Sequence, residues 1–409
     1  MIIRQEYLDR IQPFIGKPVI KAVTGLRRVG KSVFIRQIIN QLKQNGIAEK
    51  NIVYVDIESL EFDFIRTYQD LNRYLQDKTA GVAGKIYVFI DEIQDISEWE
   101  RTIASWSGQP DRYDVTITGS NSTMFSGQLS TKLTGRYIEF PIYPLSLREF
   151  RDFFPEFSDN EKLFDNYLRY GGLPGLRILD ELRDETVLPF LRSIHDTIVL
   201  KDIVARRNIR NTSLLADICR FIYDNISKPL TASSISAYLK NQKISVTVPS
   251  VINYLTGLVD SQLFYKAYRF DLKGKRQLEI NNKYYAADLG LRHSQIGYRS
   301  SDISYLMENL VYLELLRCFD QVYTGEMGKW EVDFVALKNA KPHYFQVTMN
   351  LAEPAVIERE TRSLLAIQDN FPKTIITYDK IHGDGIAGIE VVNLIPESVK
   401  KMEKKARQK

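Results

Sequence analysis

Mostly apolar runs alternate with amphipathic stretches along the first 145 residues. Runs at 19–24, 51–56, 86–90 and 114–119 predict strands, and such runs are typical of parallel strands buried on both faces. After the first run, Phe34, Ile35, Ile38, Ile39 and Leu42 recur at helical spacing. We therefore expect residues 1–145 to form an α/β domain around a parallel sheet.

The next 145 residues are mainly helical in pattern. Val187, Phe190, Leu191, Ile194 and Ile198 mark one apolar helix face, and we expect residues 146–210 to form a helical lid or linker. Three shorter helical patterns follow at 214–226, 231–239 and 248–263, and a basic, hairpin-like segment spans 265–285. Three helices followed by a hairpin are the arrangement of a winged helix-turn-helix, which we expect over 211–290.

The last part of the chain mixes both patterns. We expect a helix at 304–318, strands at 329–337 and 343–348, a helix near 358–368 and a strand at 374–378. This order resembles the restriction-endonuclease fold, which we expect over 300–399. The resemblance implies a helix glutamate, a strand aspartate and a Glu/Asp-x-Lys segment on the next strand, which together bind Mg²⁺ and activate water.

The nuclease-like set is incomplete in this chain. Glu308 and Asp333 match its first two members, but the third place holds Gln346-Val347-Thr348. Gln346 is neutral and a poor Mg²⁺ ligand, and Thr348 cannot supply the charge of a lysine. We therefore expect an inactive scaffold that holds a DNA backbone or a partner, in preference to a working nuclease.

The composition of the 409 residues is that of a folded globular protein, with 44% hydrophobic and 26% charged residues. No apolar run approaches the ~18–20 residues needed to cross a bilayer, and the start lacks the pattern of a secretory signal. Two cysteines, Cys219 and Cys318, are too few for a disulfide framework, and the histidines lack the spacing of a zinc site. These features predict a cytoplasmic protein with no membrane partner.

The positive charge of the chain is unevenly distributed. The formal net charge is +4, but residues 400–409 hold six basic residues against Glu403, so the remainder is close to neutral. We expect this basic tail to be a solvated terminus. The less favoured alternative is an arm that binds nucleic acid. Any polyanion site in the folded part must then be a local patch, and one lies between Lys228 and Lys283.

Within that patch, the predicted hairpin carries five candidate DNA contacts. They are Lys266, Arg269, Lys273, Lys275 and Arg276. A tight basic hairpin suits contact with phosphates along a groove. The helix expected at 248–263 has no Arg or Lys to read guanine edges, so DNA binding here would be largely sequence-independent. The alternative is a winged helix used for packing or for contact with protein.

A glycine-rich loop connects the first predicted strand to the first predicted helix. Its residues are Gly25, Leu26, Arg27, Arg28, Val29, Gly30, Lys31, Ser32 and Val33. The first eight match G-x-x-x-x-G-K-[ST] between a strand and a helix. Glycines let backbone amides surround a polyphosphate, Lys31 can contact the β- and γ-phosphates, and the Ser32 hydroxyl can ligate Mg²⁺. The loop therefore predicts a nucleoside triphosphate site with Mg²⁺.

The second half of this site is expected where neighbouring strands end. Asp91 and Glu92 follow the run at 86–90, with Asp91 on the metal side and Glu92 orienting the attacking water. A glutamate at that place favours hydrolysis over binding alone. The run at 114–119 ends in Ser120-Asn121-Ser122, where a polar side chain could contact the γ-phosphate or the water, or simply cap a helix.

Several segments together resemble the prokaryotic AAA-type ATPases that carry a C-terminal domain of unknown function. The segments are 25–32, 86–92, 118–122, 134–136, 143–150 and 170–174. The resemblance implies ATP as the nucleotide and an additional-strand P-loop sheet, with the acidic strand beside the sensor strand. It makes Asn121 or Ser120 the sensor, and Arg136 an arginine finger for a neighbouring subunit, which requires a homo-oligomer. From the residues alone, Arg136 is as readily an ordinary surface arginine.

Taken together, we expect an α/β chain in which an AAA-type P-loop sheet with a helical lid precedes a winged helix and a nuclease-like domain. Lys31, Glu92, Asn121 and Arg136 are its candidate catalytic residues, with ATP and Mg²⁺ as cofactors. The preferred function is ATP hydrolysis coupled to work on DNA. The alternatives are a signalling or defence switch acting on a protein partner, and, disfavoured, an ATP-dependent nuclease.

Overall fold

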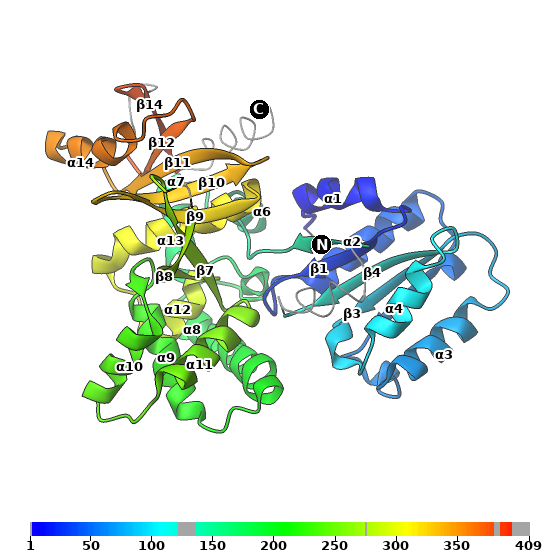
Figure 1. Cartoon of the computed structure of the whole chain (residues 1–409). Coiled ribbons are helices and arrows are strands. Elements are labelled where there is room, and N and C mark those ends of the chain that lie inside the picture. The colour runs from blue at the N-terminus through cyan, green and yellow to red at the C-terminus, as the bar shows by residue number, and fades with distance from the viewer. Residues whose placement is uncertain (1, 122–135, 275, 380–384, 395–409) are drawn as a thin grey trace. The chain divides into compact units, whose positions relative to one another are not determined.

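The computed structural model describes residues 2–121, 136–274, 276–379 and 385–394. The basic tail at 400–409 and the candidate Lys275 lie outside these residues. The chain forms two compact units (Figure 1). The first, Met1–Pro144 with Asp260–Gln262, is called the nucleotide unit below, and the second, Leu145–Val259 with Leu263–Lys409, is called the C-terminal unit.

The nucleotide unit contains a five-stranded parallel sheet in the order β2-β3-β4-β1-β5. Its strands are β1 (Ile20–Thr24), β2 (Ile52–Asp56), β3 (Ile86–Asp91), β4 (Tyr113–Gly119) and β5 (Tyr137–Pro141). The helices are α1 (Gln5–Ile11), α2 (Lys31–Gln44), α3 (Tyr68–Thr79) and α4 (Glu100–Ser107). Strand β4 separates the loop-bearing β1 from the acidic β3. This order confirms the expected α/β sheet with an additional strand.

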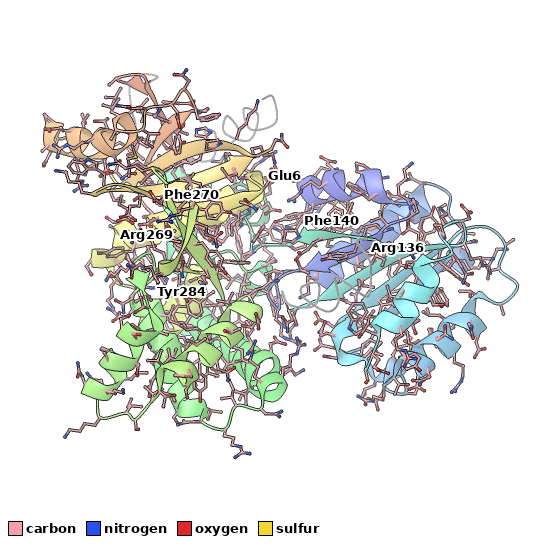
Figure 2. The ribbon with its side chains drawn as sticks, viewed as in Figure 1. Glu6, Arg136, Phe140, Arg269, Phe270 and Tyr284 are labelled. Carbon is pink, nitrogen blue, oxygen red and sulfur yellow. The ribbon has the colours of Figure 1, made fainter. Side chains whose placement is uncertain are left out.

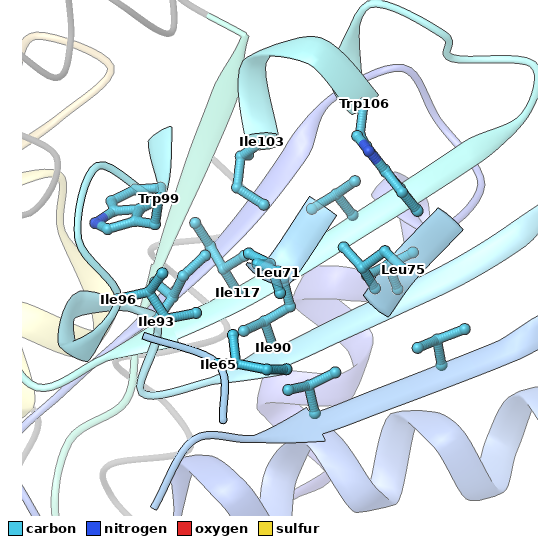
Figure 3. Packing of buried hydrophobic residues seen from close by; sticks show 14 of the residues in the cluster. Ile65, Leu71, Leu75, Ile90, Ile93, Ile96, Trp99, Ile103, Trp106 and Ile117 are labelled. Carbon is cyan, nitrogen blue, oxygen red and sulfur yellow. The ribbon is translucent and has the colours of Figure 1, made fainter. Parts of the chain in front are cut away.

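Burial on both faces explains why these strands are apolar runs. All five residues of β1 are buried, and so are five of the six in β3. On one face, Leu71 and Leu75 of α3 and Ile103 and Trp106 of α4 pack over the sheet (Figure 3). Each such side chain contributes roughly 1.5–3 kcal/mol when fully buried. The core therefore holds β1, β3 and β4 in fixed register, and with them the loops at their carboxyl ends.

The C-terminal unit combines helices with a nine-stranded sheet of order β13-β14-β12-β11-β10-β9-β7-β8-β6. Its helices are α6 (Leu147–Phe153), α7 (Asn160–Tyr170), α8 (Asp184–Thr197), a π-helical segment (Ile198–Ala205), α9 (Thr212–Asp224), α10 (Ala232–Asn241), α11 (Val248–Asp260), α12 (Leu289–Ile296), α13 (Ile303–Cys318) and α14 (Pro354–Leu365). Its strands are β6 (Pro229–Leu230), β7 (Phe264–Asp271), β8 (Arg276–Ala286), β9 (Gln321–Met327), β10 (Trp330–Lys338), β11 (Lys341–Thr348), β12 (Lys373–Thr377), β13 (Gly385–Ile386) and β14 (Ile389–Asn393).

The winged-helix and nuclease-like segments share this one sheet, whereas we expected two separate domains at 211–290 and 300–399. The hairpin strands β7 and β8 pair antiparallel, as a wing does, but β7 also pairs in parallel with β9. The register joins Arg269 to Thr324 and Phe270 to Gly325. A free strand edge leaves backbone N–H and C=O groups without partners, and the pairing with β9 covers this edge of β7 at residues 269–271. The β7–β8 hairpin, which we expected to be a wing, is therefore part of the same sheet as β9 to β12.

The segment Tyr170-Gly171-Gly172 packs against Asp288, the residue that caps α12. The Asp288 carboxylate accepts hydrogen bonds from the backbone N–H of Gly172 at 2.7 Å and of Leu291 at 3.1 Å. Gly171 has φ +76°, and a Cβ on it would collide with that carboxylate. Glycine is needed at this position because any side chain would displace the cap. The motif therefore has a packing role inside the C-terminal unit.

Candidate functional site

The loop between β1 and α2 has the backbone of an anion-binding turn. Gly25, Arg28 and Gly30 all have positive φ, of 154°, 71° and 99°. A Cβ on Gly25 would collide with the carbonyl oxygen of Ile142, so only glycine allows this close approach. Helix α2 begins directly after Gly30, at Lys31. The first amides of a helix lack intrahelical acceptors, so they are available to a phosphate group.

The nine predicted loop residues divide by what their side chains contact. Leu26 and Val29 are fully buried and belong to the core, whereas Val33 is 41% exposed on the first turn of α2. Arg27 Nη1 lies 2.6 Å from Glu58 Oε1, and its own side chain is nearly buried. The Arg28 side chain is exposed. Among these five residues, Arg27 and Arg28 are the two whose side chains carry a positive charge beside the loop.

Lys31 is the cation at the centre of the loop, and its side chain is only 3% exposed. Its Nζ donates to the carbonyl oxygens of Gly25 at 3.0 Å and Leu26 at 3.4 Å. The same ammonium lies 3.2 Å from Glu92 Oε1. Lys31, the first residue of α2, and Glu92, which follows β3, therefore form a buried ion pair in this structure.

Glu92 follows β3 and adopts φ +54°. Its backbone N–H donates to Thr118 Oγ1 at 2.9 Å, and Gln94 Nε2 donates to its Oε2 at 2.5 Å. Burial opposes the charged form of Glu92, but the ammonium of Lys31 and the Gln94 hydrogen bond outweigh it and lower the pKa to about 2. Glu92 is therefore a carboxylate at neutral pH.

Asp91 lies on the other side of the same strand end. Thr118 Oγ1 donates to its Oδ1, and the Tyr54 hydroxyl donates to its Oδ2 at 3.2 Å. Asp56 ends β2 directly opposite Asp91, and its pKa is raised by burial and by the Asp91 charge. Carboxylates and a hydroxyl such as that of Ser32 are the oxygen ligands that Mg²⁺ prefers. The donor set at this edge therefore suits the predicted metal.

Sequence reasoning did not assign roles to Tyr54, Thr118, Gln94 and Asp56. Thr118 orients both Asp91 and Glu92 from the adjacent strand β4. Thr118 opens the segment at 118–122, which the sequence analysis had already selected, and this position could have marked it as a site residue. Tyr54 lies in the middle of β2 and Asp56 ends it, and neither carried a local pattern that could have marked it.

The two remaining catalytic candidates lie at opposite ends of the sheet. Ser120 and Asn121 follow β4, whose last residue pairs with Thr24 beside the glycine loop. Arg136 precedes β5, and its carbonyl accepts from Ile20 N–H at the amino end of β1. Figure 2 labels Arg136 and Phe140 on this part of the chain. At roughly 3.3 Å per residue, β5 puts about 16 Å between Arg136 and the loop edge of the sheet.

The wing cations differ in exposure. Arg269 Nη2 pairs with Glu326 Oε2 at 3.0 Å, and the Lys266 ammonium lies 4.4 Å from the Tyr268 ring (Figure 2 labels Arg269 on β7). Lys273 and Arg276, at the tip of the hairpin, are exposed, with Arg276 74% exposed. Four of the five predicted contacts are thus placed, and the two at the tip are those that solvent reaches most.

The nuclease-like residues are brought together in the C-terminal unit. Asp333 N–H donates to Gln346 Oε1 at 3.1 Å, and the Val347 N–H donates to Asp333 Oδ2 at 2.8 Å. Glu308 of α13 accepts from Lys283 of β8 at 2.8 Å. Lys283 was counted only as part of the basic patch, because nothing in the local sequence connects it to Glu308.

Comparison with known families agrees with the geometry of the nucleotide unit. Residues 17–151 match the family described as an AAA domain. The expectation of an AAA-type P-loop domain is therefore confirmed. Residues 161–302 match a family described as a domain of unknown function (DUF8612). The restriction-endonuclease-like character of residues 300–399 stays a prediction.

Two curated proteins resemble almost the whole chain. An uncharacterized protein of Haemophilus influenzae is 37% identical over 398 residues, which cover 97% of this chain and 98% of that protein. The chain belongs to the family of this Haemophilus protein. An uncharacterized protein of Methanocaldococcus jannaschii is similar to this chain at lower identity, 27% over 380 residues, which cover 88% of this chain and 82% of that protein.

Among solved structures, the Aeropyrum pernix ORC2 protein in its ADP form is 11% identical, with a TM-score of 0.37. The match covers 75% of this chain and 92% of that one. Similarity at this level does not indicate the activity of the family. In the described parts of the chain, no helix is both long and apolar enough to span a bilayer.

Proposed function

We propose that this protein binds ATP with Mg²⁺ in the glycine loop and hydrolyses it. One observation carries the proposal: a buried ammonium and a buried carboxylate, Lys31 and Glu92, meet 3.2 Å apart beside a loop of positive-φ residues at a helix N-terminus. Holding two opposite charges out of water is costly unless they are paired and hydrogen-bonded. A bound triphosphate would replace Glu92 as the partner of the Lys31 ammonium. The Glu92 carboxylate would then be available to act on water.

Each residue then has one task. The amides at the start of α2 and the Lys31 ammonium hold phosphate oxygens, and Glu92 orients the attacking water and attracts its proton. Ser32 and Asp91 would hold Mg²⁺, which supplies positive charge to the phosphate oxygens. Thr118 holds Asp91 and the backbone of Glu92 in place. Asn121 contacts the γ-phosphate or the water from the end of β4.

The function is tested by phosphate release from ATP with the full chain. We expect steady release with Mg²⁺ and a loss of at least roughly 100-fold when EDTA removes the metal, since the ion offsets several kcal/mol of developing charge. Calorimetry with Mg-ATP should show one site per chain. Equal release with and without EDTA would contradict the assignment of Ser32 and Asp91.

Arg136 fits a role in a neighbouring subunit. Within one chain it lies at the amino end of β5, about 16 Å from the carboxyl edge of the sheet by the strand rise. We propose that it reaches the nucleotide of an adjacent copy, and that the protein works as a homo-oligomer.

Coupling to DNA is a second candidate function, favoured by the exposed tip of the β7–β8 hairpin. Lys273 and Arg276 stand there in solvent, and Asp271 is the acid beside them, 3.9 Å from Arg276 Nε. Exposed cations on a hairpin suit phosphate contact without base reading. We propose sequence-independent DNA binding at this tip.

We expect the double variant Lys273→Ala/Arg276→Ala to lower affinity for duplex DNA about tenfold at low salt and to reduce the salt slope by about two. Fluorescence anisotropy at several salt concentrations measures both quantities. The control Lys43→Ala/Lys162→Ala removes two exposed lysines elsewhere and should change little. Wild-type protein that does not bind DNA, or binds it independently of salt, would instead favour the switch that acts on a protein partner.

A further inference from the structure

A charged cluster lies where β8, α13 and β10 of the C-terminal unit meet, with Lys283 buried, Glu308 mostly buried and Glu331 at its rim 54% exposed. The Lys283 side chain is 6% exposed, and its Nζ lies 2.8 Å from Glu308 Oε1 and 2.6 Å from Glu331 Oε1. The Tyr285 hydroxyl donates to the same Glu308 oxygen at 2.7 Å. Lys283 and Tyr285 point to the same face of β8, two residues apart. One ammonium therefore connects a wing strand with the helix and the strand of the nuclease-like scaffold.

The residues of this cluster do not suit a divalent metal. A nuclease site of this fold would need oxygens from α13, β10 and β11 around one cation. Here Gln346 Oε1 accepts from the Asp333 N–H, and Thr348 Oγ1 donates to the Asn350 carbonyl at 3.1 Å. Across the described residues, no group of three or more His, Cys, Asp or Glu is arranged to hold a metal ion.

Burial alone would lower the pKa of Lys283, but the nearby carboxylates of Glu308, Glu331 and Asp333 outweigh it and raise the pKa above its usual range, so the side chain is an ammonium.

We propose that the ammonium of Lys283 is the resident cation of the nuclease-like site. It takes the place of a divalent metal between Glu308 and Glu331, so the domain does not cut DNA. The same contacts fasten β8 of the wing to α13 and β10 of the scaffold.

The first test is the stability of Lys283→Met, which keeps the apolar stem and removes the charge. The change leaves the buried Glu308 carboxylate without its cation, with only the Tyr285 hydroxyl still donating to it, so we expect the equilibrium constant for unfolding to rise roughly 10²–10³-fold in urea titrations of the full chain. Lys266→Met on the neighbouring strand β7 is the matched control and should change it less than about threefold. The double variant Lys283→Met/Glu308→Gln should recover most of the loss. A Lys283→Met protein as stable as wild type would overturn the proposal.

The second test does not depend on whether Lys283→Met folds. Mn²⁺ titration of the wild-type chain and of Asp333→Asn, without nucleotide, should give the same binding curve by electron paramagnetic resonance. Neither protein should cleave plasmid DNA with Mn²⁺ or Mg²⁺. A Mn²⁺ site, or metal-dependent cleavage, that Asp333→Asn abolishes would overturn the proposal. Failure of ATP hydrolysis would leave it intact, because the cluster lies in the C-terminal unit.

Discussion

Glu92→Gln is expected to bind ATP at least as tightly as wild type and to hydrolyse it roughly 10²–10³-fold more slowly. Hydrolysis falls because an amide cannot attract the proton of the attacking water. ATP affinity is retained or improves severalfold, because in this variant ATP no longer has to break an ion pair between Lys31 and a carboxylate 3.2 Å away. The substitution also removes a negative charge from the surroundings of a triphosphate.

Two measurements separate these effects, calorimetry with Mg-ATP for affinity and phosphate release for turnover. The control Glu49→Gln makes the same chemical change in the same unit, at a side chain that is 84% exposed and paired with Lys43. It should leave both quantities unchanged. Normal turnover by Glu92→Gln would show that another group activates the water.

Lys31→Met should lose ATP binding by roughly 100-fold or more. The Lys31 ammonium is a buried cation at the centre of the loop, and charged hydrogen bonds to phosphate are worth several kcal/mol when water is excluded. Calorimetry measures the loss. The exposed Lys43 of the same helix is the matched control, and Lys43→Met should bind ATP normally.

This variant also leaves Glu92 buried without its ammonium, so some of the loss could come from a less stable domain. The double variant Lys31→Met/Glu92→Gln removes both charges and should recover the melting temperature without recovering ATP binding. If the double variant binds ATP as wild type does, Lys31 is a structural residue.

The nucleotide unit could be predicted from sequence because its signals are local. The glycine loop, the strand before it and the acidic pair at 91–92 each occupy fewer than ten consecutive residues, and parallel strands buried on both faces are continuous apolar runs. The sheet order then follows from the family resemblance. The exception within the runs is Lys21, which pairs with Asp114 at 2.6 Å, 93 residues away, with both side chains buried.

The C-terminal unit was harder to predict because its defining contacts join residues that are distant in sequence. The parallel pairing of β7 with β9 connects residues 55 positions apart, and no local pattern marks a strand as an internal one. Lys283 contributed to the basic patch as a surface charge would, yet it is buried against Glu308. Arg269 is likewise half-buried and paired. Counting charges along the chain therefore overestimated the number of basic side chains on the hairpin that DNA could contact.

The continuous nine-stranded sheet has a practical consequence for dividing the protein. A boundary between residues 290 and 300 would separate β7 from β9, with which it pairs at residues 269–271. Each fragment would then expose an unpaired strand edge, which favours aggregation. The same boundary would also separate Lys283 from its acidic partners. Exchanging residues 211–290 alone for the matching segment of a relative would therefore interrupt the sheet.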